Sequence, residues 1–243
     1  MILILRIACL AAALVLAAAS ARAEALPRLV MNTEEDPPYN FTDPSTGGLS
    51  GIAGELVPMV LKRAGIEYEI RMLPWRRAYE TAQRQPNTCV FAINLTEERR
   101  PLFKWVTPVA KGGWTLFGRQ DWTRQVRSLE DIRDVPVVAQ AGSGIEALLV
   151  DSGIQVVPVT ALPTMMPMLA NRRADLVAIG ATNGPWLARQ AGVELQPVLR
   201  LSTTELGIAC SLTTDDRLVD RMHAALRQLR AEGVVDEIAK RYE

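Results

Sequence analysis

Short apolar runs alternate with amphipathic segments along most of the chain. The runs are rich in aliphatic side chains, as expected of buried parallel strands. They occupy residues 28–32, 68–73, 89–93, 136–140, 154–157, 175–179 and 206–210. Helix-type patterns occupy 51–65, a segment that starts at Pro74, 145–150, 164–171, 215–230 and 234–241. Strands that alternate with helices at this spacing predict crossover connections, a largely parallel sheet and therefore an α/β fold.

The pattern stops after Pro108 and then restarts, which predicts two lobes of similar architecture. Residues 111–118 are expected to form a linking strand. No low-complexity segment separates the two halves, so we expect the lobes to be joined by a pair of extended strands rather than by a flexible tether.

Residues 88–108 carry candidate binding chemistry at the end of a predicted strand. Polar residues Asn94 and Thr96 follow the apolar run, and Arg99 lies in the acid–base cluster after them. In open α/β sheets, ligands bind beyond the carboxyl ends of the strands. A guanidinium there is a permanently charged fork that suits a carboxylate or a phosphate. The alternative is an ordinary charged surface loop after a core strand.

A proline-rich loop follows the first predicted strand. Pro37 and Pro38 exclude a helix, so Asp36, Tyr39 and Glu35 are expected on a rigid loop at the carboxyl end of that strand. Because a loop acid is usually just solvated, a binding role for these side chains competes with plain exposure to solvent.

The first 23 residues are expected to be a secretory signal peptide. Arg6 supplies the positive charge, residues 7–19 are apolar, and Ala21-Arg22-Ala23 fits a cleavage site. Cleavage would remove Arg6 and Arg22, so that 25 of the 27 basic residues remain against 27 acidic ones, a net charge of about −2. This balance gives no reason to expect nucleic acid as a partner. No later apolar run is long enough to cross a bilayer, and we expect an exported protein.

Cys89 and Cys210 remain in the mature chain. An oxidising compartment favours a disulfide. Both cysteines lie in strand-like apolar runs, however, where a free cysteine behaves as a small hydrophobic residue. We therefore expect two free buried thiols and keep the disulfide as the alternative. The single histidine, His223, lies on a polar helix, so we expect no metal site, and without a phosphate-binding glycine motif we expect no cofactor.

Four segments match a known pattern in their order and spacing. They are Glu35-Asp-Pro-Pro-Tyr-Asn-Phe41, Gly51-Ile-Ala-Gly-Glu-Leu56, Thr96-Glu-Glu-Arg99 with Phe103-Lys-Trp-Val-Thr-Pro108, and the ending Leu229 to Tyr242. On these segments the chain resembles the extracellular solute-binding proteins of family 3, the periplasmic components of polar amino-acid ABC importers. The Pro74-Trp-Arg-Arg-Ala78 motif is similar to a less characterised branch of that family.

The resemblance implies a two-lobed periplasmic-binding-protein fold of type II. Lobe 1 would comprise residues 24–110 plus 206–243 and lobe 2 residues 111–205, with the ligand clamped between them. It also implies a periplasmic, non-enzymatic protein, expected to be a monomer, that binds a small polar solute and delivers it to the membrane permease of an ABC importer.

The resemblance also implies roles for individual residues. Arg99, as the arginine of the T-x-E-R motif, would hold a ligand carboxylate, and Trp75 would stack on the ligand. Backbone amides of Gly142, Ser143 and Gly144 would contact the same carboxylate at a helix start, although Ser143 also fits a plain helix cap. The remaining candidates are Asn94, Thr96, Asp36, Tyr39, Arg77 and Asn183.

One departure limits what the ligand can be. Amino-acid binders of this family have an aspartate in lobe 2 that pairs with the ligand's ammonium, and counting from Asp175 places Gly180 at that position. Glu35 or Asp36 would have to replace the missing acid. A carboxylate-bearing ligand remains the expectation, whereas a standard α-amino acid is less expected.

Two other functions compete with transport. Some periplasmic dehydratases that act on cyclohexadienyl substrates are similar to these proteins, and such an enzyme would need a cleft acid from Glu35, Asp36 or Glu98. A sensory module is the other alternative. With no transmembrane helix or kinase segment in the sequence, we do not expect a built-in sensor.

Overall fold

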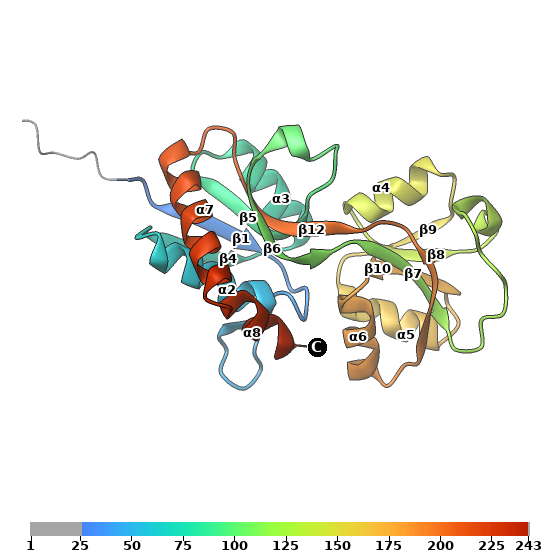
Figure 1. The fold of residues 1–243 in the computed structure, drawn as a ribbon. Coiled ribbons are helices and arrows are strands. Elements are labelled where there is room, and N and C mark those ends of the chain that lie inside the picture. The colour runs from blue at the N-terminus through green and yellow to red at the C-terminus, as the bar shows by residue number, and fades with distance from the viewer. Residues whose placement is uncertain (1–25, 243) are drawn as a thin grey trace, which may run out of the picture.

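The computed structural model describes residues 26–242 as two lobes, each built on one five-stranded sheet (Figure 1). The proposed signal peptide lies outside the described residues. The sheet of lobe 1 has the order β4 (Tyr68–Met72), β1 (Leu29–Thr33), β5 (Thr88–Asn94), β12 (Thr204–Cys210), β6 (Lys104–Gly112). The sheet of lobe 2 has the order β11 (Leu195–Arg200), β7 (Trp114–Arg119), β10 (Leu176–Gly180), β8 (Val137–Gln140), β9 (Val156–Val159). A small hairpin joins β2 (Phe41–Thr42) to β3 (Leu49–Ser50).

Both sheets are mixed rather than largely parallel. In lobe 1, β1 pairs in parallel with β4 and β5, while β12 pairs antiparallel with β5 and β6. In lobe 2, β8 pairs in parallel with β9 and β10, while β7 pairs antiparallel with β10 and β11. The chain crosses between the lobes from β6 to β7 and from β11 to β12, and all four of these strands pair antiparallel with their neighbours. The expected α/β class is therefore confirmed with a different strand pairing.

Helices cover both faces of each sheet. In lobe 1, α2 (Ile52–Arg63), α7 (Asp216–Ala231) and α8 (Val234–Lys240) pack on one face, and α3 (Trp75–Arg84) packs on the other. In lobe 2, α5 (Met165–Ala170) and α6 (Asn183–Ala191) pack on one face, and α4 (Gly144–Asp151) packs on the other. Short 3₁₀ turns are η1 (Arg100–Leu102), η2 (Leu129–Ile132) and η3 (Leu162–Thr164). Apolar faces at helical spacing thus become the two cores.

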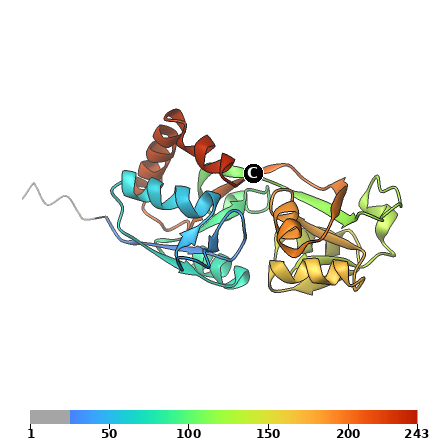
Figure 2. The ribbon, with the colours of Figure 1, turned by 90° about the horizontal axis from the view of Figure 1, so that it is seen from below.

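Strands β6 and β12 join the lobes as an antiparallel pair. The chain passes into lobe 2 through β6 and returns through β12, so N-terminal and C-terminal segments share lobe 1 (Figure 2). The boundaries at residues 110 and 206 stay a prediction, because both lie inside these two strands.

The expectation of free thiols is wrong, because Cys89 and Cys210 form a disulfide. The two residues stand directly opposite each other on the antiparallel pair β5 and β12, and both are fully buried. The sequence indicates that each cysteine lies in a strand, but it does not reveal that these two strands are neighbours or which residues stand opposite each other.

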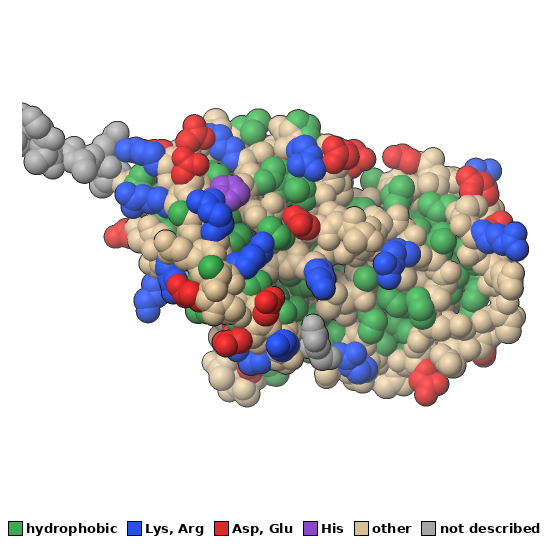
Figure 3. Space-filling model, in the orientation of Figure 1, with side chains coloured by type: hydrophobic (Ala, Val, Ile, Leu, Met, Phe, Trp, Pro, Cys, Tyr) green, Lys and Arg blue, Asp and Glu red, His purple; other side chains and the backbone are tan. Residues whose placement is uncertain are grey.

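Acidic and basic side chains are interspersed on the face that Figure 3 shows. No helix within residues 26–242 combines the length and the apolar character that crossing a membrane requires. This face therefore carries no basic patch of the kind that binds nucleic acid, in agreement with the near balance of charge in the sequence.

Candidate ligand-binding site

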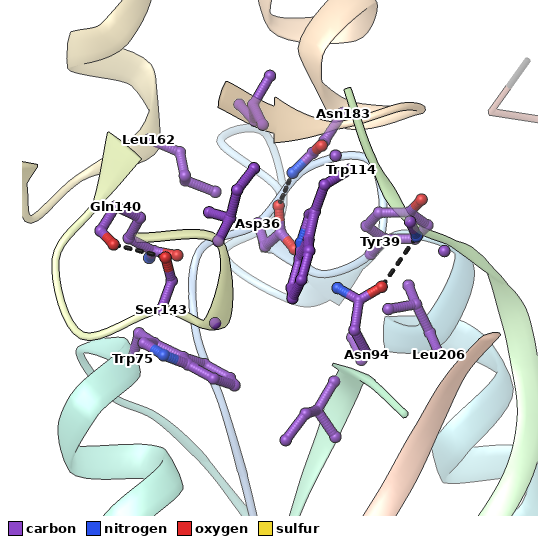
Figure 4. Close-up of a pocket in the computed structure, with 18 of the residues that line it drawn as sticks. Asp36, Tyr39, Trp75, Asn94, Trp114, Gln140, Ser143, Leu162, Asn183 and Leu206 are labelled. Atoms are coloured by element: carbon purple, nitrogen blue, oxygen red, sulfur yellow. Dashed lines mark hydrogen bonds between the residues drawn. The ribbon is translucent and has the colours of Figure 1, made fainter. Parts of the chain in front are cut away.

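A cavity of about 60 Å³ lies between the two lobes. Lobe 1 contributes side chains from the loop after β1, from the start of α3 and from the end of β5. Lobe 2 contributes the start of β7, the loop between β8 and α4, and the end of β10. The polar and aromatic residues that line it are Glu34, Asp36, Tyr39, Trp75, Asn94, Arg99, Trp114, Gln140, Ser143 and Asn183. Figure 4 labels all of these except Glu34 and Arg99.

Arg99 is the cationic side chain of this cavity. It is 8% exposed, and its guanidinium carbon lies 5.2 Å from the ring centroid of Trp75 and 5.3 Å from that of Tyr79. Nη1 donates to the backbone oxygen of Asn94 at 3.4 Å. Within residues 26–242 no carboxylate forms an ion pair with it. Two aromatic rings thus hold a buried cation beside the cavity, and a buried charge is stabilised when an anion binds it.

Thr96 and Asn94 set the position of this arginine. The Thr96 carbonyl accepts hydrogen bonds from the backbone N–H groups of Arg99 and Arg100, which forms a turn after β5. The Asn94 side chain accepts from the Gly113 amide at 2.9 Å and so ties the end of β5 to the start of lobe 2. Asn94 lines the cavity, whereas Thr96 does not.

Two carboxyl groups face the cavity from the loop after β1. Residues two apart on extended backbone share a face, and accordingly Glu34 and Asp36 line the cavity while Glu35 lies on the other side. Glu35 is exposed and accepts hydrogen bonds from Thr42. The suggestion that Glu35 could replace the missing lobe 2 acid is therefore wrong, and Glu34 is the residue that the sequence interpretation missed.

Each of these carboxyl groups binds an amide of the other lobe. Gln140 Nε2 donates to Glu34, and Asn183 Nδ2 donates to Asp36. Burial raises the pKa of Asp36 to about 7. Burial and the neighbouring charge of Asp36 hold the pKa of Glu34 well above its usual value. Around neutral pH Asp36 is therefore only partly ionised.

The raised pKa of Asp36 predicts a pH dependence of stability. Because the folded-state pKa lies above the ordinary value of 3.8 for an aspartate, Asp36 contributes stability below about pH 4 that is lost as the pH rises toward 7. Asp36→Asn stays neutral, so we expect it to be more stable than wild type by up to about 4 kcal/mol at pH 8 and equally stable at pH 4. Urea unfolding at both pH values measures this, with Glu35→Gln as the exposed control. Equal stabilities at pH 8 would contradict the assignment.

Aromatic side chains form much of the remaining wall. Trp75 Nε1 donates to the Gly142 carbonyl at 3.0 Å, and Tyr39 donates its hydroxyl proton to the Lys111 carbonyl at 3.0 Å. Burial raises the pKa of Tyr39, which keeps this hydroxyl protonated. Trp114 enters the cavity from the start of β7 (Figure 4). Trp75 therefore serves both as wall and as a link to lobe 2, whereas Tyr39 is tied to β6 at the crossing between the lobes.

The glycine-serine turn meets its expected role only in part. Ser143 caps α4 by accepting from the Glu146 amide at 3.2 Å, and its hydroxyl donates to the Gln140 carbonyl at 2.6 Å. The amides of Gly142 and Ser143 already donate to Glu146 and to Gln140. Gly144 lies closest to the arginine, since an added Cβ there would stand 3.1 Å from Arg99 Nη2. Only the Gly144 amide of the three therefore remains to face a ligand within the described chain.

Three of the ligand-binding residues predicted from the sequence do not line the cavity. Arg77 is exposed on α3, and Gly142 and Thr96 do not line the cavity. Asn183 does, and its side chain fills the space at Gly180, where an added Cβ would be 2.2 Å from Asn183 Oδ1. The position of the expected lobe 2 acid is thus occupied by a neutral amide.

Gln140 and Trp114 were not anticipated from the sequence. Gln140 ends a buried strand, and this is the same signal that identified Asn94. Trp114 sits one residue beyond a glycine pair in the linking strand, where nothing in the sequence distinguishes a cavity residue from a core residue.

A comparison with known protein families identifies the family of this chain. The profile of "Bacterial extracellular solute-binding proteins, family 3" matches residues 29–243. No curated protein sequence matches the chain significantly.

Solved structures share the fold at low sequence identity. A mutant of the arginine-binding protein ArgBP from T. maritima is 22% identical, with a TM-score of 0.79, over 88% of this chain and 94% of that one. A histidine kinase sensor domain with similarity to periplasmic binding proteins is 22% identical, with a TM-score of 0.80, over 89% and 96%. The substrate-binding protein of an amino acid ABC transporter is 15% identical, with a TM-score of 0.77, over 89% and 99%. These likenesses establish the type II periplasmic-binding-protein fold.

Proposed function

Because the chain belongs to the bacterial extracellular solute-binding proteins, family 3, we propose that it is an exported carrier of a small carboxylate-bearing solute. The solute occupies the cavity between the lobes, with its carboxylate on Arg99. The lobes close on it by bending at β6 and β12, and the closed protein presents the solute to the permease of an ABC importer in the periplasm.

Arg99 is the observation that carries this proposal. Its guanidinium is nine-tenths buried, faces the cavity, and has no ion pair within residues 26–242. A ligand carboxylate can accept two parallel N–H bonds from such a fork, an arrangement that a surface arginine rarely maintains. The Gly144 amide at the start of α4 approaches the same place from lobe 2, so an anion there contacts both lobes.

The size of the cavity favours a compact solute. A volume of about 60 Å³ holds on the order of five water molecules. A small amino acid or hydroxy acid displaces a comparable number, whereas arginine or a dipeptide requires the lobes to stand further apart. The aromatic walls of Trp75 and Trp114 give such a ligand apolar contact on its flanks.

A thermal-shift panel on the mature chain tests the proposal. We expect one or more small carboxylates to raise the melting temperature by about 5–10 °C at 100 times the dissociation constant, and amines without a carboxylate to have no effect. If amines or sugars stabilise the protein while no carboxylate does, the proposed function is wrong.

A second candidate function follows from the acidic pair. A carboxyl group with a pKa of about 7 inside a cleft can act as a general acid, as the cyclohexadienyl dehydratase alternative requires. Incubation with prephenate and arogenate, followed by NMR, tests it directly. Turnover by wild type that Asp36→Asn abolishes would favour the enzyme over the carrier.

A further inference from the structure

Trp114 enters the cavity directly after the chain has crossed into lobe 2. It is the first residue of β7 and lines the cavity from that strand. Figure 4 shows its ring projecting into the space between the lobes. An indole is the bulkiest side chain that a protein can place there, so the position of this ring decides how much of the cleft a ligand can use.

The backbone of Trp114 is fixed at the crossing. Its N–H donates to Ser202 Oγ at 3.1 Å, and its carbonyl accepts from the amides of Leu201 and Ser202 at 2.9 and 3.1 Å. The preceding residue, Gly113, donates to Asn94 Oδ1 of lobe 1 at 2.9 Å. An added Cβ at Gly113 would lie 2.5 Å from the Ser202 carbonyl oxygen, so the two crossing segments are in contact here. Trp114 is therefore tied to the returning chain and, through Gly113, to lobe 1.

The far edge of the ring lies against Gly144 at the start of α4. A Cβ added to Gly144 would stand 2.8 Å from Trp114 Cη2 and 3.1 Å from Arg99 Nη2. Gly144 is not among the glycines with a positive φ, so its backbone suits any residue. What the missing side chain provides is room for the ring and for the guanidinium. The indole thus extends from the crossing to the side of Arg99.

Apolar side chains surround the ring on the lobe 2 side. Trp114 packs against the core cluster that contains Ile145 and Ala178. Both of these residues also line the cavity, together with Leu162 and Ile179. Removal of the indole would therefore enlarge the cavity into a space with apolar walls, which suits a hydrocarbon chain.

Opening of the lobes does not relieve this restriction. When the lobes bend at β6 and β12, an atom moves further the more distant it is from these strands, so the room gained lies far from the crossing. Trp114 comes two residues after the end of β6. The space beside its ring therefore has nearly the same size in the open and the closed protein.

We propose that Trp114 determines the length of the solute, because its indole stops a ligand whose carboxylate lies on Arg99 from extending toward the crossing. The inference rests on the proposed function and deepens it, since it restricts the solute to carboxylates with a short carbon chain. Arg99 is held by Trp75, Tyr79 and the Asn94 carbonyl rather than by Trp114. A smaller side chain at position 114 therefore leaves the anchor in place and admits longer apolar chains.

The experiment is isothermal titration at pH 7.5 with two graded series of probes, the straight-chain carboxylates from acetate to octanoate and the 2-amino acids from glycine to norleucine. In at least one series we expect the wild-type affinity to fall about tenfold or more at one chain length, because extra methylene groups do not fit into a filled site. Trp114→Ala should bind the first excluded member about tenfold or more tightly than wild type does. Trp114→Phe, with its smaller ring, should shift the limit by less.

Trp122→Ala is the matched control. Trp122 packs against the same apolar cluster of lobe 2 but does not line the cavity, so this variant should keep the wild-type length limit. A folding defect cannot produce tighter binding of a longer ligand, so the gain expected of Trp114→Ala is not a result of lost stability. If Trp114→Ala does not fold, Trp114→Phe, which keeps an aromatic ring in this position, carries the test.

The outcomes separate this inference from the proposed function. If carboxylates bind and depend on Arg99 but the wild type shows no length limit, or if the Trp114 variants keep the wild-type limit, the role of Trp114 is wrong and the carrier stands. A shift of the limit in Trp122→Ala as large as that in Trp114→Ala also overturns the inference. If no member of either series binds, the proposed function fails and this inference fails with it.

Discussion

Arg99→Ala is expected to weaken binding of the ligand found in the panel by about 10²–10³-fold. Among residues 26–242, Arg99 is the one arginine that lines the cavity, and its loss leaves the ligand carboxylate without its charged partner. Truncating one member of a buried, hydrogen-bonded charge pair costs on the order of 2–5 kcal/mol, and each 1.4 kcal/mol is a tenfold change in affinity. Isothermal titration of wild type and variant at pH 7.5 measures the loss.

Two matched variants show whether the effect belongs to the site. Arg100→Ala removes the neighbouring exposed arginine, which pairs with Glu97 at the surface, and should leave affinity unchanged. Arg99→Lys keeps the charge but not the planar fork and should fall between wild type and Arg99→Ala. If Arg99→Ala binds the carboxylate as tightly as wild type while it remains folded, the assignment of Arg99 is wrong.

Loss of the Cys89–Cys210 bond is expected to lower the free energy of unfolding by about 3–5 kcal/mol. The bond closes a loop with a sequence separation of 121 residues, which includes the whole of lobe 2. A crosslink of this span restricts the unfolded chain strongly, and within the folded lobe it joins β5, which leads to Asn94 and Arg99, to the returning strand β12.

Urea unfolding with and without a thiol reductant measures this contribution. The midpoint for wild type should fall on reduction, and the midpoint for Cys89→Ala/Cys210→Ala should be low in both conditions. A non-reducing mass measurement of the exported protein checks that the bond is present. An unchanged wild-type midpoint after complete reduction would show that the crosslink adds no stability.

The sequence predicts those cavity residues that directly follow a recognisable strand. Asn94 and Arg99 come after a buried apolar run, and Asp36 and Tyr39 lie on a proline-rich strand exit. Because ligands bind at the carboxyl ends of strands in such sheets, these residues can be proposed without a structure. The positions of Trp75 and Ser143 followed from the family resemblance rather than from their local pattern.

Other features depend on contacts that a single sequence does not reveal. Choosing between Glu34 and Glu35 requires the conformation of an irregular loop, which is fixed by a bridge between Asp36 and Asn40 and by the two prolines. A shift of one residue turns the wrong side chain toward the cavity.

Proline obscured two elements of lobe 2. Helix α6 contains Pro185 in its first turn, and strand β11 contains Pro197 at a bulge. Neither element is among those that the sequence pattern predicts, because proline and glycine interrupt helical and strand patterns alike. A proline near a helix start or at a bulge of an edge strand is tolerated, and only the tertiary structure shows that these prolines hold such positions.

The structure of the protein in complex with the most stabilising carboxylate tests the central claim most directly. We predict a ligand in the cavity between the lobes, with its carboxylate hydrogen-bonded to the Arg99 guanidinium. A ligand bound outside this cavity, or one inside it whose carboxylate makes no contact with Arg99, would contradict the account.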